Sequence, residues 1–206
     1  MSETKQDIKL APQRNERIEK PFTRRAVIKR YRRKLDAAIE EGGIDALTQL
    51  PNFRGFQRNL ATEISRAERT GQILSVMYLD LNGLKTINDD KVNGGHDMGN
   101  KYIQTAAQVL RTHLRSTDVV ARIGGDEFAA ILPNADIAVV EKIWKEQLHP
   151  AFESSNPKIK ISAGVSVLDP KTDPDGSLTL KNADKNMYRA KDIAHKTGQS
   201  PLVSKQ

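Results

Sequence analysis

Two glycines and two carboxylates stand side by side near the middle of the chain, in the heptad Arg122-Ile-Gly-Gly-Asp-Glu-Phe128. Apolar runs flank the heptad, so residues 118–132 have the pattern of two strands joined by a tight turn. Glycine permits the positive φ angles that tight turns need, and its missing side chain lets a ligand approach the backbone closely. Asp126 and Glu127 would then lie beside bare backbone, which suits divalent metal and phosphate chemistry. A surface turn with solubilising acids is the alternative interpretation.

A third carboxylate, Asp80, ends an apolar run. A charged group at the end of a buried strand is costly unless it has a partner or a task. If strand 73–81 lies beside the hairpin, Asp80 and Asp126 converge on one edge of the sheet and can share a metal ion. A strand-end cap is the alternative role for Asp80. The segment Asn82-Gly-Leu-Lys85 follows directly, and N–H groups in such a turn, together with the lysine ammonium, suit phosphate binding.

The elements that would position these residues alternate between helical and strand patterns. The predicted helices are 53–70, 98–114, 137–148 and 177–193, and the predicted strands are 73–81, 159–168 and the two strands of the hairpin at 118–132. A helix is predicted where apolar residues recur every three or four positions, and a strand is predicted where a short apolar run occurs. This order predicts one α/β sheet covered by helices.

The composition limits the class of protein. With 206 residues, the chain has room for one domain of ordinary size and an appendage. It has no cysteine, which excludes disulfides and cysteine-ligated zinc and favours a reducing compartment. No apolar run approaches the roughly 20 residues needed to cross a bilayer, and the polar N-terminus lacks the apolar core of a secretory signal. We therefore expect a cytoplasmic protein without a transmembrane segment.

Positive charge is concentrated near the N-terminus. Residues 1–41 contain 12 Lys/Arg and 7 Asp/Glu, whereas the other residues contain 21 and 19, and Lys20–Lys34 has eight basic residues and no acidic one. We expect a mobile polar tail at 1–22 and a basic helix at 23–43. This helix would bind an anionic membrane, nucleic acid or an acidic partner, or it would simply present a solvated face. The weak charge bias elsewhere argues against nucleic acid as the main ligand.

Five segments resemble, in order, the motifs of the GGDEF family of diguanylate cyclases. They are Asp45-Ala-Leu-Thr-Gln-Leu-Pro-Asn52, Tyr78–Asp89, Gly95-His-Asp-Met-Gly99, the heptad at 122–128 and Ala183–Lys191. The resemblance covers roughly residues 45–200. It implies an α+β, palm-like fold similar to adenylate cyclases and polymerases, with a central, mostly antiparallel sheet flanked by helices and an N-terminal helical extension. The catalytic domain would span 44–200, followed by a tail at 201–206.

The resemblance implies an enzyme that condenses two GTP molecules into cyclic di-GMP, using Mg²⁺ or Mn²⁺, with one GTP in each subunit of a homodimer. It implies metal binding by Asp80, the carbonyl of Leu81 and Asp126. It implies that Asp126 and Glu127 are catalytic, with Glu127 acting as metal ligand or proton acceptor. The implied nucleotide-binding residues are Lys85, Asn88, Asn100, Gly124, Gly125 and Lys191.

Several positions depart from the family pattern. Asn100 stands where the family usually has an aspartate that accepts hydrogen bonds from guanine, so GTP use would weaken or another base would be admitted. The segment 89–96 is longer than usual, which would move Asn100 relative to Asn88. An expected phosphate-binding arginine after Lys191 is missing, and Lys196 is a candidate to substitute for it. Gln49 replaces a usual glycine, which we expect to affect turn geometry more than chemistry.

Arg115-Ser-Thr-Asp118 resembles the family's inhibitory site for its product, and Arg115 lies nine positions before Gly124. The planar fork of arginine can grip phosphate and stack on guanine. A structural salt bridge at a helix end is the alternative for Arg115 and Asp118. Two other functions also remain open for the chain. One is a cyclase with altered nucleotide choice, and the other is a non-catalytic module that binds GTP or cyclic di-GMP and signals through its basic N-terminal helix.

Overall fold

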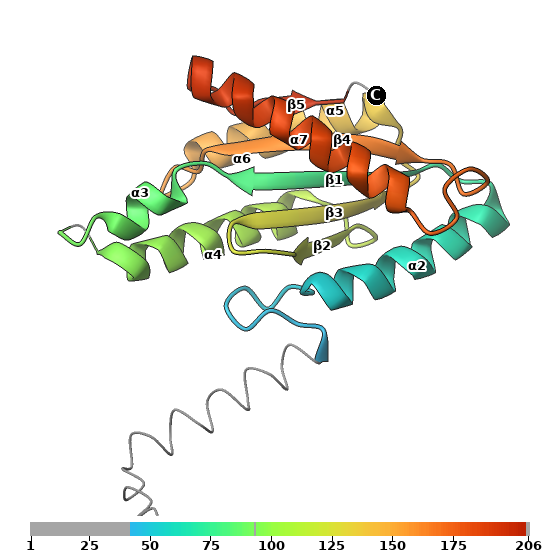
Figure 1. Ribbon diagram of the computed structural model, residues 1–206, viewed down its shortest axis with the longest axis horizontal. Coiled ribbons are helices and arrows are strands. Elements are labelled where there is room, and N and C mark those ends of the chain that lie inside the picture. Colours follow the sequence, from blue (N-terminus) through green and yellow to red (C-terminus); the bar gives the residue numbers. More distant parts are fainter. Residues whose placement is uncertain (1–41, 93, 205–206) are drawn as a thin grey trace, which may run out of the picture. The chain divides into compact units, whose positions relative to one another are not determined.

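The computed structural model describes residues 42–92 and 94–204, which all fall within one compact unit of the chain (Figure 1). The tail expected at 1–22 lies outside the described residues, and so does nearly all of the basic helix expected at 23–43. Both remain predictions. None of the helices in the described ranges is long and apolar enough to span a bilayer.

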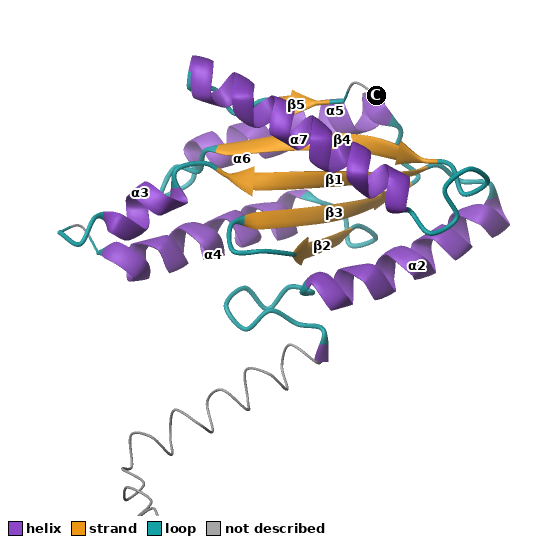
Figure 2. Ribbon diagram, in the orientation of Figure 1, coloured by secondary structure: helices purple, strands orange, loops and turns teal. Residues whose placement is uncertain are grey.

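A five-stranded sheet forms the centre of this unit, in the order β2-β3-β1-β4-β5 (Figure 2). The strands are β1 (Leu74–Leu81), β2 (Val119–Arg122), β3 (Glu127–Pro133), β4 (Ile161–Leu168) and β5 (Leu202–Val203). All pairs are antiparallel except β4 with β5. The predicted sheet, mostly antiparallel and flanked by helices, is therefore confirmed.

Helices cover both faces of the sheet. Side chains of successive strand residues point to opposite faces, so the buried strands have apolar side chains to cover on each face. On one face α2 (Phe53–Thr70) and α7 (Ser177–Thr197) pack against residues such as Val76 and Ile131. The other face is covered by α4 (Gly95–His113), α5 (Ile137–Ile143), the π-helical segment η1 (Trp144–Leu148) and α6 (His149–Ser154). Asp80 is two residues after Tyr78 and four after Val76, so it faces α2 and α7.

The predicted helices and strands exist, with shifted boundaries. Helix α2 has the predicted bounds because the Asn52 side chain accepts the N–H of Gly55 at its start and Gly71 ends it in the left-handed conformation. Helix α4 begins three residues before the predicted start, after Gly94. A short helix, α3 (Leu84–Asp89), forms where we expected a turn or a helix start.

The C-terminal segment corrects one expectation. Residues 201–206 were expected to form a tail, but Leu202 and Val203 form β5 and pair with Ala163 and Gly164 of β4. Leu202 also packs against the main hydrophobic cluster. A two-residue strand is too short to show a period in the sequence, so only its partner strand reveals it.

Candidate functional site

The end of β1 and the tip of the β2–β3 hairpin bring four predicted site residues together. Asp80 lies directly opposite Glu127 in the pairing of β1 with β3, so both side chains are on one face of the sheet. The N–H of Leu81 donates a hydrogen bond to the carbonyl oxygen of Asp126 (3.0 Å), which fixes the hairpin tip at the end of β1. The predicted pairing of strand 73–81 with the hairpin is therefore confirmed.

Asp80 is only 3 % exposed, although it carries a carboxylate. Its Oδ2 accepts a hydrogen bond from Nζ of Lys191 (2.9 Å), whereas Oδ1 is buried and has no partner among the described residues. Burial raises the pKa of Asp80, Lys191 opposes this rise, and the charge of Asp126 adds to it. An unpartnered buried carboxylate oxygen is unfavourable, and a divalent cation would satisfy it. The site therefore offers a donor that fits a metal ion.

The carbonyl group of Leu81, another predicted metal ligand, points toward the hairpin. The N–H of Asn82 donates to the carbonyl oxygen of Lys160 (2.8 Å), just before β4. Because a trans peptide is planar, the Leu81 carbonyl faces the opposite way, toward Asp126. Within 42–92 and 94–204, no three His, Cys, Asp or Glu side chains are grouped to hold a metal ion. A cation here would therefore need this backbone oxygen beside the carboxylates of Asp80 and Asp126.

Gly124 and Gly125 form the hairpin tip, but not for the reason expected from the sequence. Neither glycine has a positive φ angle, so the expectation that this turn needs left-handed backbone is wrong. A Cβ atom on Gly124 would overlap the carboxylate of Glu127, so the missing side chain makes room for that group. A Cβ atom on Gly125 would meet no atom within 4 Å, so the tip is open there.

Arg122 connects the hairpin tip to Asp45, in the first of the five family-like segments. Its Nη2 and Nε donate to the carbonyl oxygen of Gly125 (2.7 and 3.3 Å), and its Nη1 donates to both carboxylate oxygens of Asp45 (3.1 and 3.2 Å). The side chains of Arg122 and Asp45 are 15 % and 20 % exposed, so the ion pair is largely shielded from solvent. Neither role was predicted from the sequence, because 77 residues separate the partners and no local pattern marks such a pair.

Helix α7 adds further charge to the same face of the sheet. Asp184, Tyr188 and Lys191 recur at spacings of four and three, which places them on one side of the helix. Burial raises the pKa of Glu127, and neighbouring acids, Asp184 among them, raise it further. Burial, with the charges of Asp184 and Glu127, raises the pKa of Tyr78 to about 12. Neither Asp184 nor Tyr78 was predicted as a site residue, although the helical spacing was a signal for Asp184.

The predicted base-binding residues lie where α3 packs against α4. A Cβ atom on Gly99 would overlap the side-chain oxygen of Asn88, so this asparagine lies against α4 at the residue before Asn100. The expected shift of Asn100 by the longer segment 89–96 remains a prediction. Lys85 and Asn100 are both exposed. Because α3 begins soon after the end of β1, this region adjoins the acidic residues.

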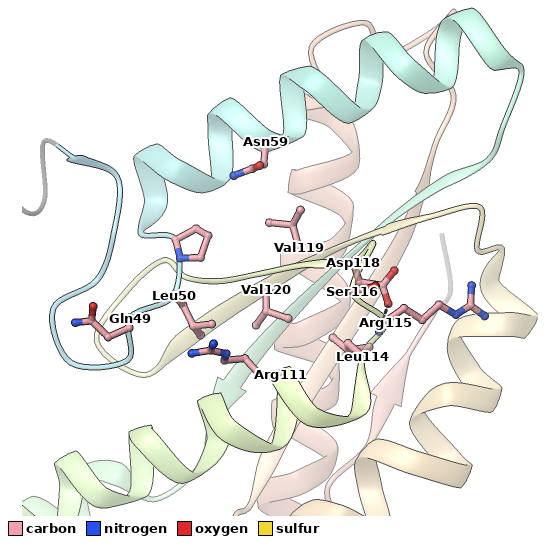
Figure 3. A pocket seen from close by; sticks show the side chains of 11 residues that line it. Gln49, Leu50, Asn59, Arg111, Leu114, Arg115, Ser116, Asp118, Val119 and Val120 are labelled. Carbon is pink, nitrogen blue, oxygen red and sulfur yellow. Dashed lines mark hydrogen bonds between the residues drawn. The ribbon is translucent and has the colours of Figure 1, made fainter.

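The predicted inhibitory residues lie at the other end of the hairpin, beside a cavity of about 440 Å³ (Figure 3). Asp118 accepts the N–H of Arg115 with Oδ2 (2.9 Å) and donates its own N–H to the Arg115 carbonyl oxygen (2.9 Å), which closes a tight turn. Burial raises the pKa of Asp118, and Arg115 opposes this rise. The exposed Arg115 side chain extends away from Arg111, which lies on the other side of the cavity.

Comparison with known proteins identifies the architecture. Residues 43–197 match the family described as diguanylate cyclase, GGDEF domain. The chain belongs to the GGDEF family. Curated relatives include diguanylate cyclase DgcP of Pseudomonas aeruginosa, which is 34 % identical over 154 residues covering 71 % of this chain and 22 % of the relative. The response regulator PleD of Caulobacter vibrioides is 29 % identical over 197 residues covering 92 % of this chain and 42 % of PleD. The chain thus spans less than half of each of these relatives.

Solved GGDEF structures share the fold. The GGDEF domain of DgcB from Caulobacter crescentus, solved in complex with c-di-GMP, is 25 % identical with a TM-score of 0.67, covering 79 % of this chain and 95 % of that one. The active GGEEF domain of a Vibrio cholerae diguanylate cyclase is 26 % identical with a TM-score of 0.66, covering 77 % and 99 %. The predicted family membership and palm-like fold are confirmed.

In this GGDEF domain the predicted residues fall into three places. At the end of β1 are Asp80, Leu81, Gly124, Gly125, Asp126, Glu127 and Lys191; on α3 and α4 are Lys85, Asn88 and Asn100; at the start of β2 are Arg115 and Asp118. The first two places adjoin, and the third lies at the far end of the hairpin. The roles of these residues remain predictions.

Proposed function

We propose that the chain is a metal-dependent diguanylate cyclase that condenses two GTP molecules into cyclic di-GMP and releases two pyrophosphates. The observation that carries this proposal is the Asp80 carboxylate, which is buried opposite Glu127 with one oxygen unpartnered. The match to the GGDEF family and the curated diguanylate cyclases among its relatives support it.

The reaction has simple requirements. The 3′-hydroxyl of each GTP attacks the α-phosphate of the other, a P–O bond forms, the bond to the β-phosphate breaks, and pyrophosphate leaves. Glu127 accepts the hydroxyl proton, and its raised pKa makes it a better base at neutral pH. Mg²⁺ or Mn²⁺, held by Asp80, the Leu81 carbonyl and Asp126, would supply positive charge to the triphosphate.

Two lysines supply positive charge for the triphosphate. Lys191 stays protonated, because its hydrogen bond and ion pair with Asp80 outweigh the effect of burial and raise its pKa. Lys85 is exposed near the start of α3, where it can reach a phosphate without breaking an internal bond described for this chain. Both ammonium groups offset the charge that pyrophosphate carries away.

Catalysis in a homodimer follows from the reaction. One chain has one set of these residues, so each subunit holds one GTP and the two sites must face each other. The open surface around Gly125 supports this arrangement, because a partner nucleotide can approach the hairpin tip there. We also propose that cyclic di-GMP binds at Arg115 and Asp118 and inhibits the reaction, since an exposed guanidinium lies beside the 440 Å³ cavity.

Product identification tests the proposed function and the base that the enzyme reads. The purified protein is incubated with Mg²⁺ and GTP, ATP or both, and products are identified by mass spectrometry. Cyclic di-GMP from GTP would support the proposal and show that Asn100 still reads guanine. A mixed or adenine-containing product would keep the mechanism and change the substrate. No product from any mixture, in folded protein that binds GTP, would favour a non-catalytic binding module.

A further inference from the structure

Tyr102 links three elements through one buried hydroxyl group. It lies in α4 with 3 % of its surface exposed. The hydroxyl accepts the N–H of Lys160 (2.7 Å) and donates toward the carbonyl oxygens of Asn82 (3.1 Å) and Lys160 (3.3 Å). Asn82 immediately follows β1, and Lys160 immediately precedes β4. One side chain of α4 therefore bonds to the ends of two neighbouring strands.

These bonds hold the peptide that carries a predicted metal ligand. The N–H of Asn82 donates to the Lys160 carbonyl oxygen, so Tyr102 contacts both this acceptor and the carbonyl group of Asn82 itself. Asn82 also donates from its side chain to the hydroxyl of Ser162 (2.8 Å). With Asn82 fixed on both sides, the direction of the Leu81 carbonyl toward the hairpin is fixed as well.

The same helix carries the predicted base-binding end of the site. Asn100 lies two residues before Tyr102, and Gly99 contacts Asn88 of α3. We propose that Tyr102 is a positioning residue that sets the separation between the base-binding end on α3 and α4 and the metal-binding end on β1. This inference rests on the proposed function, because GTP is the ligand that spans both ends.

Two physical arguments support this role. Burial raises the pKa of the Tyr102 hydroxyl, and although its bond to Lys160 opposes this rise, the phenol stays neutral and able both to donate and to accept. A ligand that binds two subsites gains affinity when their separation is fixed, since binding at one end raises its effective concentration at the other. Loss of the hydroxyl should therefore lower the affinity for a ligand that spans both ends of the site more than the affinity for a ligand that reaches one end.

Tyr102→Phe tests this because it keeps the packed ring and removes the three hydrogen bonds. Affinities of full-length wild type and variant are measured by calorimetry with Mg²⁺ for two probes, GMP and α,β-methylene GTP, which cannot release pyrophosphate. We expect about tenfold weaker binding of the triphosphate analogue, the factor that corresponds to one net hydrogen bond. We expect GMP binding to change by less than about twofold, since it reaches only the base-binding end.

Ser75→Ala is the matched control. Ser75 lies on the same strand β1, is fully buried, and donates its hydroxyl to the carbonyl oxygen of Ala135 (2.7 Å) far from the site. It should lower the thermal midpoint about as much as Tyr102→Phe and leave both affinities unchanged. Equal weakening of both probes by Tyr102→Phe, or no weakening of either, would overturn the inference. If the wild type itself fails to bind the triphosphate analogue, the proposed function fails and this inference fails with it.

Discussion

At the tip of the β2–β3 hairpin several polar groups are already bonded to the protein, whereas at the other end of β2 the guanidinium of Arg115 faces solvent. At the tip, Arg122 holds the carbonyl of Gly125, Leu81 holds that of Asp126, and Lys191 is paired with Asp80. At the other end, the exposed guanidinium of Arg115 extends beside an open cavity.

This difference separates two kinds of site on one hairpin. Groups that stabilise a transition state must be in place before the reaction, because reorganising them costs free energy at the barrier. Groups that bind a regulatory ligand can remain solvated until the ligand arrives, at an entropic cost to its affinity. Changes at the tip should therefore affect turnover strongly, and changes around Arg115 should affect only the response to product.

The largest effect is expected from Asp80→Asn. The amide removes the charge of the buried metal-binding candidate and keeps its size, so cyclic di-GMP formation should fall at least about 1000-fold. The thermal midpoint of the wild type should rise on addition of Mn²⁺ with α,β-methylene GTP, and this rise should be absent in the variant. An unchanged metal-induced rise would show that the cation binds elsewhere.

Glu127→Gln should lower kcat by about 100-fold or more, because the amide cannot accept the hydroxyl proton. Initial rates of pyrophosphate release at saturating GTP measure this effect. Glu146→Gln, an exposed change on the covering η1 segment, is the matched control and should leave the rate unaltered. A rate within about threefold of wild type for Glu127→Gln would remove this residue from the proton-accepting role.

Arg122→Ala should reduce kcat by about 10- to 100-fold, since the hairpin tip then loses its bonds to Gly125 and Asp45 and the neighbouring acids are less well placed. Arg66→Ala, which removes another arginine ion pair, to Glu63, serves as control in the same rate assay. Equal rates for the two variants would mean that the tip needs no such support.

Arg115→Ala should change regulation. The concentration of added cyclic di-GMP that halves the initial rate should rise at least about tenfold, because the exposed guanidinium would no longer grip phosphate. Arg69→Ala, an exposed arginine at the end of α2, should leave this concentration as it is in the wild type. Unchanged inhibition of Arg115→Ala would place the product site elsewhere.

Gln49→Gly should have the smallest effect and a stabilising one. Gln49 has a φ angle of 58°, a left-handed conformation that costs a side chain free energy and that glycine adopts readily. The expected gain is about 0.5 kcal/mol, seen as an increase of about 1–2 °C in the thermal midpoint. Asn134→Gly, at φ 54°, should gain less because asparagine tolerates this region. A lower midpoint for Gln49→Gly would show that its hydrogen bond to Ala46 matters more.

The sequence was sufficient for the parts of the site that depend on local periodicity. Apolar runs predicted β1 and the hairpin, and their pairing placed Asp80 beside Glu127, with Asp126 at the end of β1. The left-handed backbone of Gln49 agrees with the expectation that its replacement of a usual glycine affects turn geometry.

The remaining features depend on contacts between distant residues, which no local pattern contains. Arg122 and Asp45 are 77 residues apart, and Tyr102 reaches a partner 58 residues away. The role of the two glycines at the tip also differed from expectation, because neither has a positive φ angle. Gly124 leaves room for the carboxylate of Glu127. This requirement follows from the folded hairpin, in which the Glu127 side chain lies against Gly124.

Simultaneous measurement of pyrophosphate and cyclic di-GMP from GTP tests the central claim most directly. Wild-type protein with Mg²⁺ should release two pyrophosphates for each cyclic di-GMP formed, and Asp126→Ala should release neither, because the hairpin-tip acid is then missing. Pyrophosphate release without cyclic di-GMP, or the same yield from Asp126→Ala, would contradict the assignment of the β1 end and hairpin tip as the catalytic centre.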